Sequence, residues 1–105
     1  MTVNNHDALK TALKQLAADA PEQEAYLAGL GVLPSTDELA LELDDARLGI
    51  TLDDGEARRL LERLDTQLEQ MSGEQNARLW TIDALKMAPE WIEVRRLANQ
   101  VLLAL

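Results

Sequence analysis

Residues 38–52 read ELALELDDARLGITL, and the secondary structure of this stretch decides the fold class of the chain. Apolar residues alternate with other residues along two short runs, namely Leu39, Leu41 and Leu43, and then Leu48, Ile50 and Leu52. Strict alternation is typical of strands with one buried face. A hairpin with a four-residue loop at positions 44–47 would pair the two runs and place all six apolar side chains on one face.

The same stretch also has features of a helix. Ser35 and Glu38 have the spacing of a capping box, and leucine, glutamate and alanine favour helix. A helix would move Leu41 and Leu48 away from the stripe that Leu39 and Leu43 share. We predict the hairpin and keep the helix as the alternative, which would make the fold all-α.

Helical patterns cover most of the remaining chain, and proline and glycine divide them. Pro21, Gly31, the Ser72–Gly73 pair and Pro89 stand at the expected helix ends. The expected helices are Asp7–Ala20, Glu22–Leu30, a segment from Asp53 or Asp54 to about Met71, Glu74–Met87, and a last helix from Pro89 onward. We therefore predict a mainly α fold, a single domain of residues 1–105 with about five helices and one small β-hairpin.

The segment before Met71 carries a stripe with heptad-like spacing, formed by Ala57, Leu61, Leu64, Leu68 and Met71. The chain also ends on the apolar residues 103–105. Both features predict a homodimer held by helices. The alternative is that the stripe faces the core of its own chain.

Reactive side chains are scarce. The chain contains 21 leucines, no cysteine and one histidine, His6, which excludes a zinc cluster. The hydroxyls of Ser35 and Ser72 lie at expected helix boundaries and have no second histidine to serve as a base. The acidic pairs at 44–45 and 53–54 do not follow the ligand spacing of a calcium loop. We expect no enzymatic activity, no cofactor and no metal.

The net charge is −9, and residues 1–55 carry eleven acidic side chains against three basic ones. This field repels nucleic acids and anionic membranes and attracts a basic protein. Arg58, Arg59 and Arg63 could suggest a DNA-reading helix, but five acidic residues surround them in residues 54–71. The absence of cysteine and of a secretory pattern at the N-terminus predicts a cytoplasmic protein.

The acidic half and one tryptophan are the predicted contacts for a partner. Trp80 and Trp91 are the large aromatic residues, and each could be a core residue rather than an interface residue. The predicted partner-binding residues are Glu38, Glu42, Asp44, Asp45, Asp53, Asp54 and Trp91.

In outline the chain resembles the small acidic chaperones of bacterial type III secretion. The matching features are the acidic balance, the helix at Asp7–Ala20, the alternating stretch Leu39–Leu52 and the apolar last helix. The resemblance implies a cytoplasmic, dimeric protein that holds another protein. That family uses a larger sheet than the two strands expected here, and no functional residue carries over.

The sequence therefore favours a non-enzymatic protein-binding module, such as a chaperone, an adaptor or an inhibitor. The alternative is a structural or assembly subunit whose apolar helices meet permanent partners. A regulatory DNA-binding protein is disfavoured by the charge.

Overall fold

The computed structural model describes residues 6–31, 36–48, 52 and 55–105, and these residues form helices and turns without any strand. The elements are α1 (His6–Ala17), α2 (Ala20–Leu30), α3 (Asp37–Arg47), α4 (Glu56–Gln70), the 3₁₀ helix η1 (Glu74–Leu79), α5 (Ile82–Met87) and α6 (Pro89–Ala104). The mainly α fold class predicted from the sequence is confirmed.

The hairpin predicted for residues 39–52 is wrong over its first run and its loop, because α3 continues as one helix through Arg47. Leu39 and Leu43 are buried one helical turn apart, whereas Leu41 is half exposed. Leucines at i and i+4 suit one helix face as well as alternate strand positions, and the strong helix formers in between favour the helix. Of the second run, Leu48 is an exposed turn residue, and positions 49–51 lie outside the described residues.

Two other predicted boundaries also need correction. α1 ends at Ala17 rather than Ala20, and residues 74–87 form η1 and α5 rather than one helix. The break falls at Trp80 and Thr81, where the Thr81 hydroxyl accepts a hydrogen bond from the Ala84 amide and caps α5.

Several predicted helix ends are observed. Gly31 ends α2 in the left-handed conformation with φ 74°, and Pro89 is the first residue of α6. The predicted cap Ser35 lies outside the described residues, as do Asp53 and Asp54, where the next helix is predicted to begin. Thr36 and Gly55 immediately precede α3 and α4.

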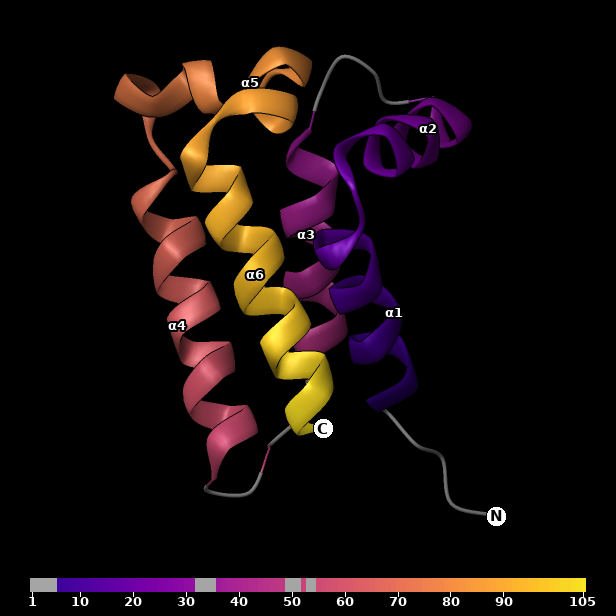
Figure 1. Cartoon of the computed structure of the whole chain (residues 1–105), viewed down its shortest axis with the longest axis vertical. Coiled ribbons are helices and arrows are strands. Elements are labelled where there is room, and N and C mark those ends of the chain that lie inside the picture. The colour runs from indigo at the N-terminus through magenta and orange to yellow at the C-terminus, as the bar shows by residue number, and fades with distance from the viewer. Residues whose placement is uncertain (1–5, 32–35, 49–51, 53–54) are drawn as a thin grey trace.

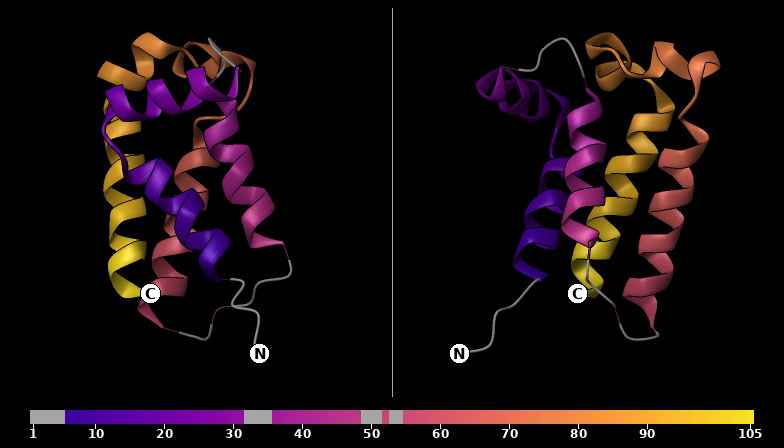
Figure 2. Two further views of the ribbon diagram at one scale, coloured as in Figure 1. Left: turned by 90° about the vertical axis from the view of Figure 1, so that its right-hand side faces the viewer. Right: turned by 180° about the vertical axis from the view of Figure 1, so that it is seen from behind.

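α1, α3, α4 and α6 run along the long axis of the molecule, and α2, η1 and α5 lie across one end (Figure 1). α1 packs against both α3 and α6, and α4 packs against α6. At the end of the bundle, α2 packs against α5 (Figure 2). Since α3 and α4 are not among the closely packed pairs of described helices, the bundle is more open between them.

The heptad-like stripe of α4 faces the core of its own chain. Leu61, Leu64, Leu68 and Met71 are buried in the same cluster as the inner face of α6. The alternative prediction, that this stripe faces the core of its own chain, is therefore the one observed. The stripe of α4 gives no support to a dimer. Leu103, near the apolar chain end, is 80% exposed.

Candidate functional site

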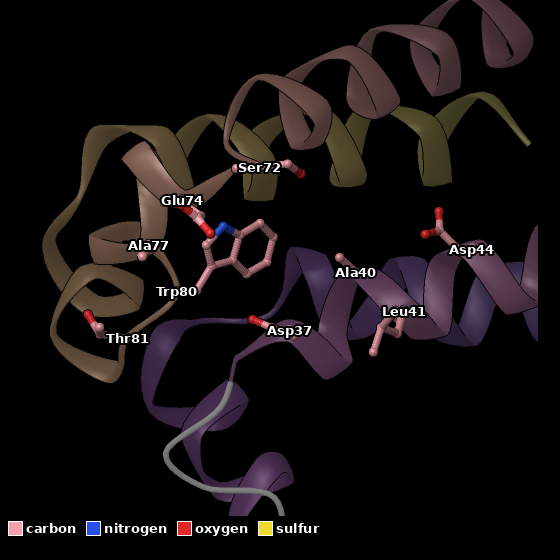
Figure 3. A pocket seen from close by; sticks show the side chains of 10 residues that line it. Asp37, Ala40, Leu41, Asp44, Ser72, Glu74, Ala77, Trp80 and Thr81 are labelled. Carbon is pink, nitrogen blue, oxygen red and sulfur yellow. The ribbon is translucent and has the colours of Figure 1, made fainter.

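A groove of about 770 Å³ lies between α3 and the segment that follows α4. We call it the α3 groove. One wall is α3 and the other is residues 72–81, which include η1 (Figure 3). Its lining residues are Asp37, Ala40, Leu41, Asp44, Ser72, Gly73, Glu74, Ala77, Trp80 and Thr81.

Trp80 forms the large apolar surface of the groove, and its indole projects towards α3 (Figure 3). The indole N–H donates a hydrogen bond to the Met71 carbonyl oxygen at 2.7 Å. Its ring meets Trp91 edge-on, with centroids 5.3 Å apart and an interplanar angle of 83°. Because two independent contacts fix the ring, Trp80 presents a preorganised surface that loses little freedom when a ligand binds.

The charge of the groove has one sign. Asp37 and Asp44 lie on α3 and Glu74 lies on the opposite wall, and none of the lining residues is lysine or arginine. Between the two aspartates of α3, Leu41 is 52% exposed. The groove therefore combines apolar contact surface with three carboxylates, which suits a cationic and partly apolar ligand.

The hydroxyls in the groove are engaged in local structure. The Ser72 hydroxyl donates to the Leu68 carbonyl, and the Thr81 hydroxyl donates to the Arg78 carbonyl while capping α5. Both residues thus stabilise helix ends. Among the described residues, no cluster of histidine, cysteine, aspartate or glutamate could hold a metal ion.

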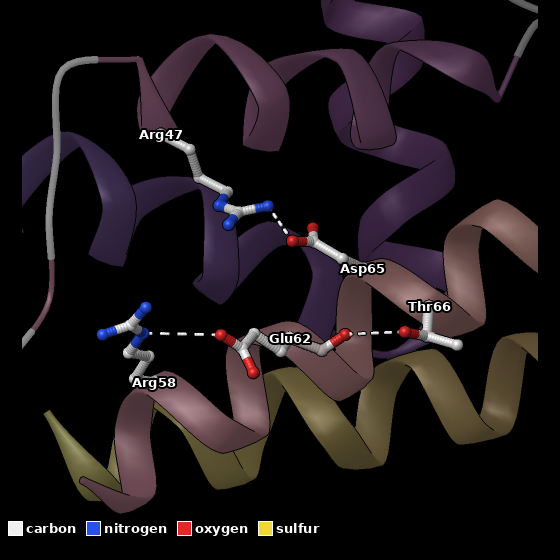
Figure 4. A network of polar contacts seen from close by, with 5 residues as sticks. All are labelled: Arg47, Arg58, Glu62, Asp65 and Thr66. Carbon is white, nitrogen blue, oxygen red and sulfur yellow. Dashed lines mark hydrogen bonds and ion pairs between the residues drawn. The ribbon is translucent and has the colours of Figure 1, made fainter. Parts of the chain in front are cut away.

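Polar contacts on both sides hold α3 in place. On the side of α2, the Tyr26 hydroxyl donates a hydrogen bond to Glu42. This bond, together with burial, raises the pKa of Tyr26 to about 12. On the side of α4, Arg47 forms an ion pair with Asp65 (Figure 4). These contacts fix the helix that forms one wall of the groove.

The structure brings only part of the predicted partner-binding set to the groove. Asp44 lines it, whereas Glu42 is bonded to Tyr26 and Asp45 lies on a separate cleft between α1 and α3. Glu38 is half buried on α3 and is not among the lining residues. Asp53 and Asp54 lie outside the described residues.

Trp91 is the clearest difference from the predicted set. It is 0% exposed, and its indole N–H donates to the Leu79 carbonyl at 2.6 Å. It is therefore a core residue, as the alternative interpretation held, and it offers no surface to a partner in this structure. Its role in the site is to support Trp80.

Sequence reasoning missed Asp37, Leu41, Glu74 and Trp80 as site residues. One signal was present, since Asp37, Ala40, Leu41 and Asp44 share a face of a helix by their spacing of three, one and three residues. This pattern is not apparent when the stretch is interpreted as a hairpin. Glu74 and Trp80 give no such signal, because only the antiparallel course of α3 and α4 brings them to the groove (Figure 1).

The three arginines of α4 lie among carboxylates. Arg58 is 3.4 Å from Glu62 (Figure 4). Arg59 and Arg63 line a cleft along α4 and α6 that also contains Glu62 and Glu93. This surface therefore carries charges of both signs.

Comparisons with protein-family models, curated proteins and solved structures find no match for this chain. The outline resemblance to secretion chaperones rests in part on the alternating stretch, and α3 occupies the first run of that stretch. Among the described residues, no helix has the length and apolar character needed to cross a membrane.

Proposed function

We propose that this chain is a non-enzymatic protein-binding module that holds an apolar and basic segment of a partner protein in the α3 groove. The observation that carries the proposal is the lining of the groove, in which three carboxylates accompany the exposed side chain of Leu41 and the partly exposed ring of Trp80. A chaperone, an adaptor or an inhibitor would each hold a partner in this way.

A protein segment suits the groove better than a small molecule. Small-molecule sites are concave and bury most of the ligand, with a few polar groups of mixed character. The α3 groove is open to solvent, and its charged lining groups are all carboxylates. An open acidic groove around a fixed tryptophan is instead typical of a surface that receives a hot-spot residue and its basic neighbours.

The proposal is tested with two matched variants. Leu41 in the groove is 52% exposed, and Ile92 on the outer side of α6 is 56% exposed. Leu41→Arg places a bulky cation in the groove, and Ile92→Arg makes the same change elsewhere. Neither position is buried and arginine is a good helix former, so both variants should fold, as circular dichroism would verify.

Selection of a random peptide library on the immobilised wild-type chain should enrich basic peptides that contain large apolar residues. These peptides should bind Ile92→Arg as well as the wild type and should lose binding to Leu41→Arg. Peptides that still bind Leu41→Arg, or a selection that enriches none, would show that the α3 groove is not the binding surface.

Self-association is a separate part of the proposal. Leu103, near the end of α6, is 80% exposed, and a second copy could cover it. Light scattering at micromolar concentration should then show a dimer that Leu103→Arg weakens. A monomer of 11.7 kDa at every concentration would contradict the homodimer.

The alternative of an assembly subunit predicts different behaviour. A permanent partner would cover a large apolar surface, and the isolated chain would then aggregate or bind its partner without exchange. The isolated chain already buries a continuous core, which favours a module that binds and releases.

A further inference from the structure

The wall that α3 contributes to the groove has a regular pattern. Asp37, Ala40, Leu41 and Asp44 occupy positions i, i+3, i+4 and i+7 of one helix and together line the groove. At 1.5 Å of rise per residue, the backbone positions of the two aspartates are about 10.5 Å apart along the helix axis. The stripe therefore presents two carboxylates two turns apart, with apolar surface between them.

Part of the backbone of the opposite wall is already hydrogen-bonded. The amides of Ser72, Asn76 and Trp80 donate to the carbonyls of Glu69, Gly73 and Ala77. The described residues contain no strand, so they provide no sheet edge with which a segment could pair. An extended segment lying against Leu41 and Trp80 would leave those of its amides and carbonyls that face this apolar surface without partners, which is costly.

A helical segment avoids this cost because its backbone hydrogen bonds are internal. Residues seven apart on a helix lie on the same face at the same axial spacing as Asp37 and Asp44. Long lysine or arginine side chains can reach the carboxylates while their methylene groups pack on apolar surface. The residues between them, at i+3 and i+4, would face Leu41 and Trp80.

We infer that the partner segment held in the α3 groove is an amphipathic helix with two basic residues seven positions apart and apolar residues between them. This inference rests on the proposed function and names its ligand class. Glu74 on the second wall adds a third carboxylate (Figure 3). An acidic helix of the same shape is rejected by repulsion from all three groups.

The probes are three fluorescent, alanine-rich peptides of equal length, roughly 18 residues, which is long enough to form a helix in water. The first carries lysines seven residues apart with leucines at i+3 and i+4. In the second the lysines are five apart and so point to different faces. The third keeps the first pattern but has proline in place of one central alanine, which breaks the helix. Fluorescence anisotropy should show the first peptide binding at least about tenfold more tightly than the other two.

Matched protein variants test the carboxylates. Asp37→Asn with Asp44→Asn removes two groove charges, and Asp7→Asn with Glu56→Gln removes two exposed charges at the starts of α1 and α4. Each double variant changes the net charge of −9 by the same two units. The groove variant should bind the first peptide about fivefold less tightly at low salt, with a weaker salt dependence, whereas the control should change little.

The outcomes separate this inference from the proposed function. Equal binding of the proline peptide would overturn the helical ligand, and equal binding of the second peptide would overturn the seven-residue spacing. Equal weakening by the two double variants would overturn the role of Asp37 and Asp44. In each case the groove would remain the binding surface provided that Leu41→Arg still abolishes binding. Binding of the first peptide to Leu41→Arg would overturn both proposals.

Discussion

The two sides of the helical bundle differ in how many of their apolar residues are buried. α6 lies against both α1 and α4 and buries five residues, Trp91, Val94, Leu97, Ala98 and Val101. α3 has one closely packed neighbour, α1, and buries only Leu39 and Leu43. Part of the apolar surface of α3 therefore remains exposed, and it lies beside the densest group of acidic side chains in the chain.

The two tryptophans show the same contrast within a single contact. Trp91 lies wholly in the core and Trp80 is partly exposed in the α3 groove, although their rings meet edge-on. The closed side, formed by α6 and its neighbours, therefore supports the ring of Trp80 through Trp91. The open side, along α3, exposes that ring in the groove. Substitutions on one side of the bundle that leave the other side unchanged test this difference.

The largest expected effect is on the closed side. Trp91→Ala removes a fully buried indole and its hydrogen bond to Leu79, so it should lower the free energy of unfolding by about 3–5 kcal/mol. Denaturant unfolding followed by circular dichroism measures this loss. A loss below about 1 kcal/mol would show that the core does not depend on this residue.

The next effect separates the two faces of α3. Leu39→Ala removes a side chain that is 1% exposed and should cost about 2–5 kcal/mol, whereas Leu41→Ala should cost less than about 0.5 kcal/mol. Both residues would share a buried face in a hairpin. Similar losses for the two variants, measured by the same denaturation, would therefore favour the hairpin over α3.

These leucines also show how far the sequence predicts the fold. Proline and glycine mark where helices start and stop, and Pro21, Gly31 and Pro89 do so in the structure. The stretch around Leu41 is different, since its leucine spacing satisfies both a strand and a helix locally. Only packing against α1 selects the face that contains Leu39 and Leu43.

The candidate site was less predictable than the fold. Asp44 was found from its charge alone, but Asp37 and Glu74 lie far apart in the chain and meet only through the course of α3 and α4. The roles of the tryptophans depend on the break between η1 and α5, which places Trp80 at the surface. Hydrophobicity ranks the two residues equally and cannot predict that difference.

A smaller effect is expected where α1, α2 and α6 meet. The buried Gln23 side chain donates to the carbonyls of Gln15 and Leu16 and accepts a hydrogen bond from Arg95. Gln23→Met keeps the volume but removes these three hydrogen bonds, so it should cost about 1–3 kcal/mol. The exposed Gln70→Met is the control, and equal stabilities of the two variants in denaturant would contradict a role for the buried amide.

The smallest effect concerns the contact that fixes α3 to α2. The hydrogen bond to Glu42, together with burial, raises the pKa of Tyr26 to about 12, above the usual value of 10.0. In the unfolded chain the phenol ionises near its usual pKa, so between about pH 10 and 12 the unfolded state loses its proton first. The stabilising contribution of Tyr26 is therefore complete below pH 10 and disappears as the pH rises through the folded pKa.

This contact can be followed directly because Tyr26 is the single tyrosine of the chain. Its ultraviolet absorbance should titrate near pH 12 in the wild type and closer to pH 10 in Glu42→Gln, which removes the charged acceptor. Tyr26→Phe should cost only about 1 kcal/mol at neutral pH, since a single partly exposed hydrogen bond is lost. If the wild type and Glu42→Gln titrated alike, the bond between Tyr26 and Glu42 would not form in solution, and the position of α3 would depend on its packing against α1 and on the ion pair between Arg47 and Asp65.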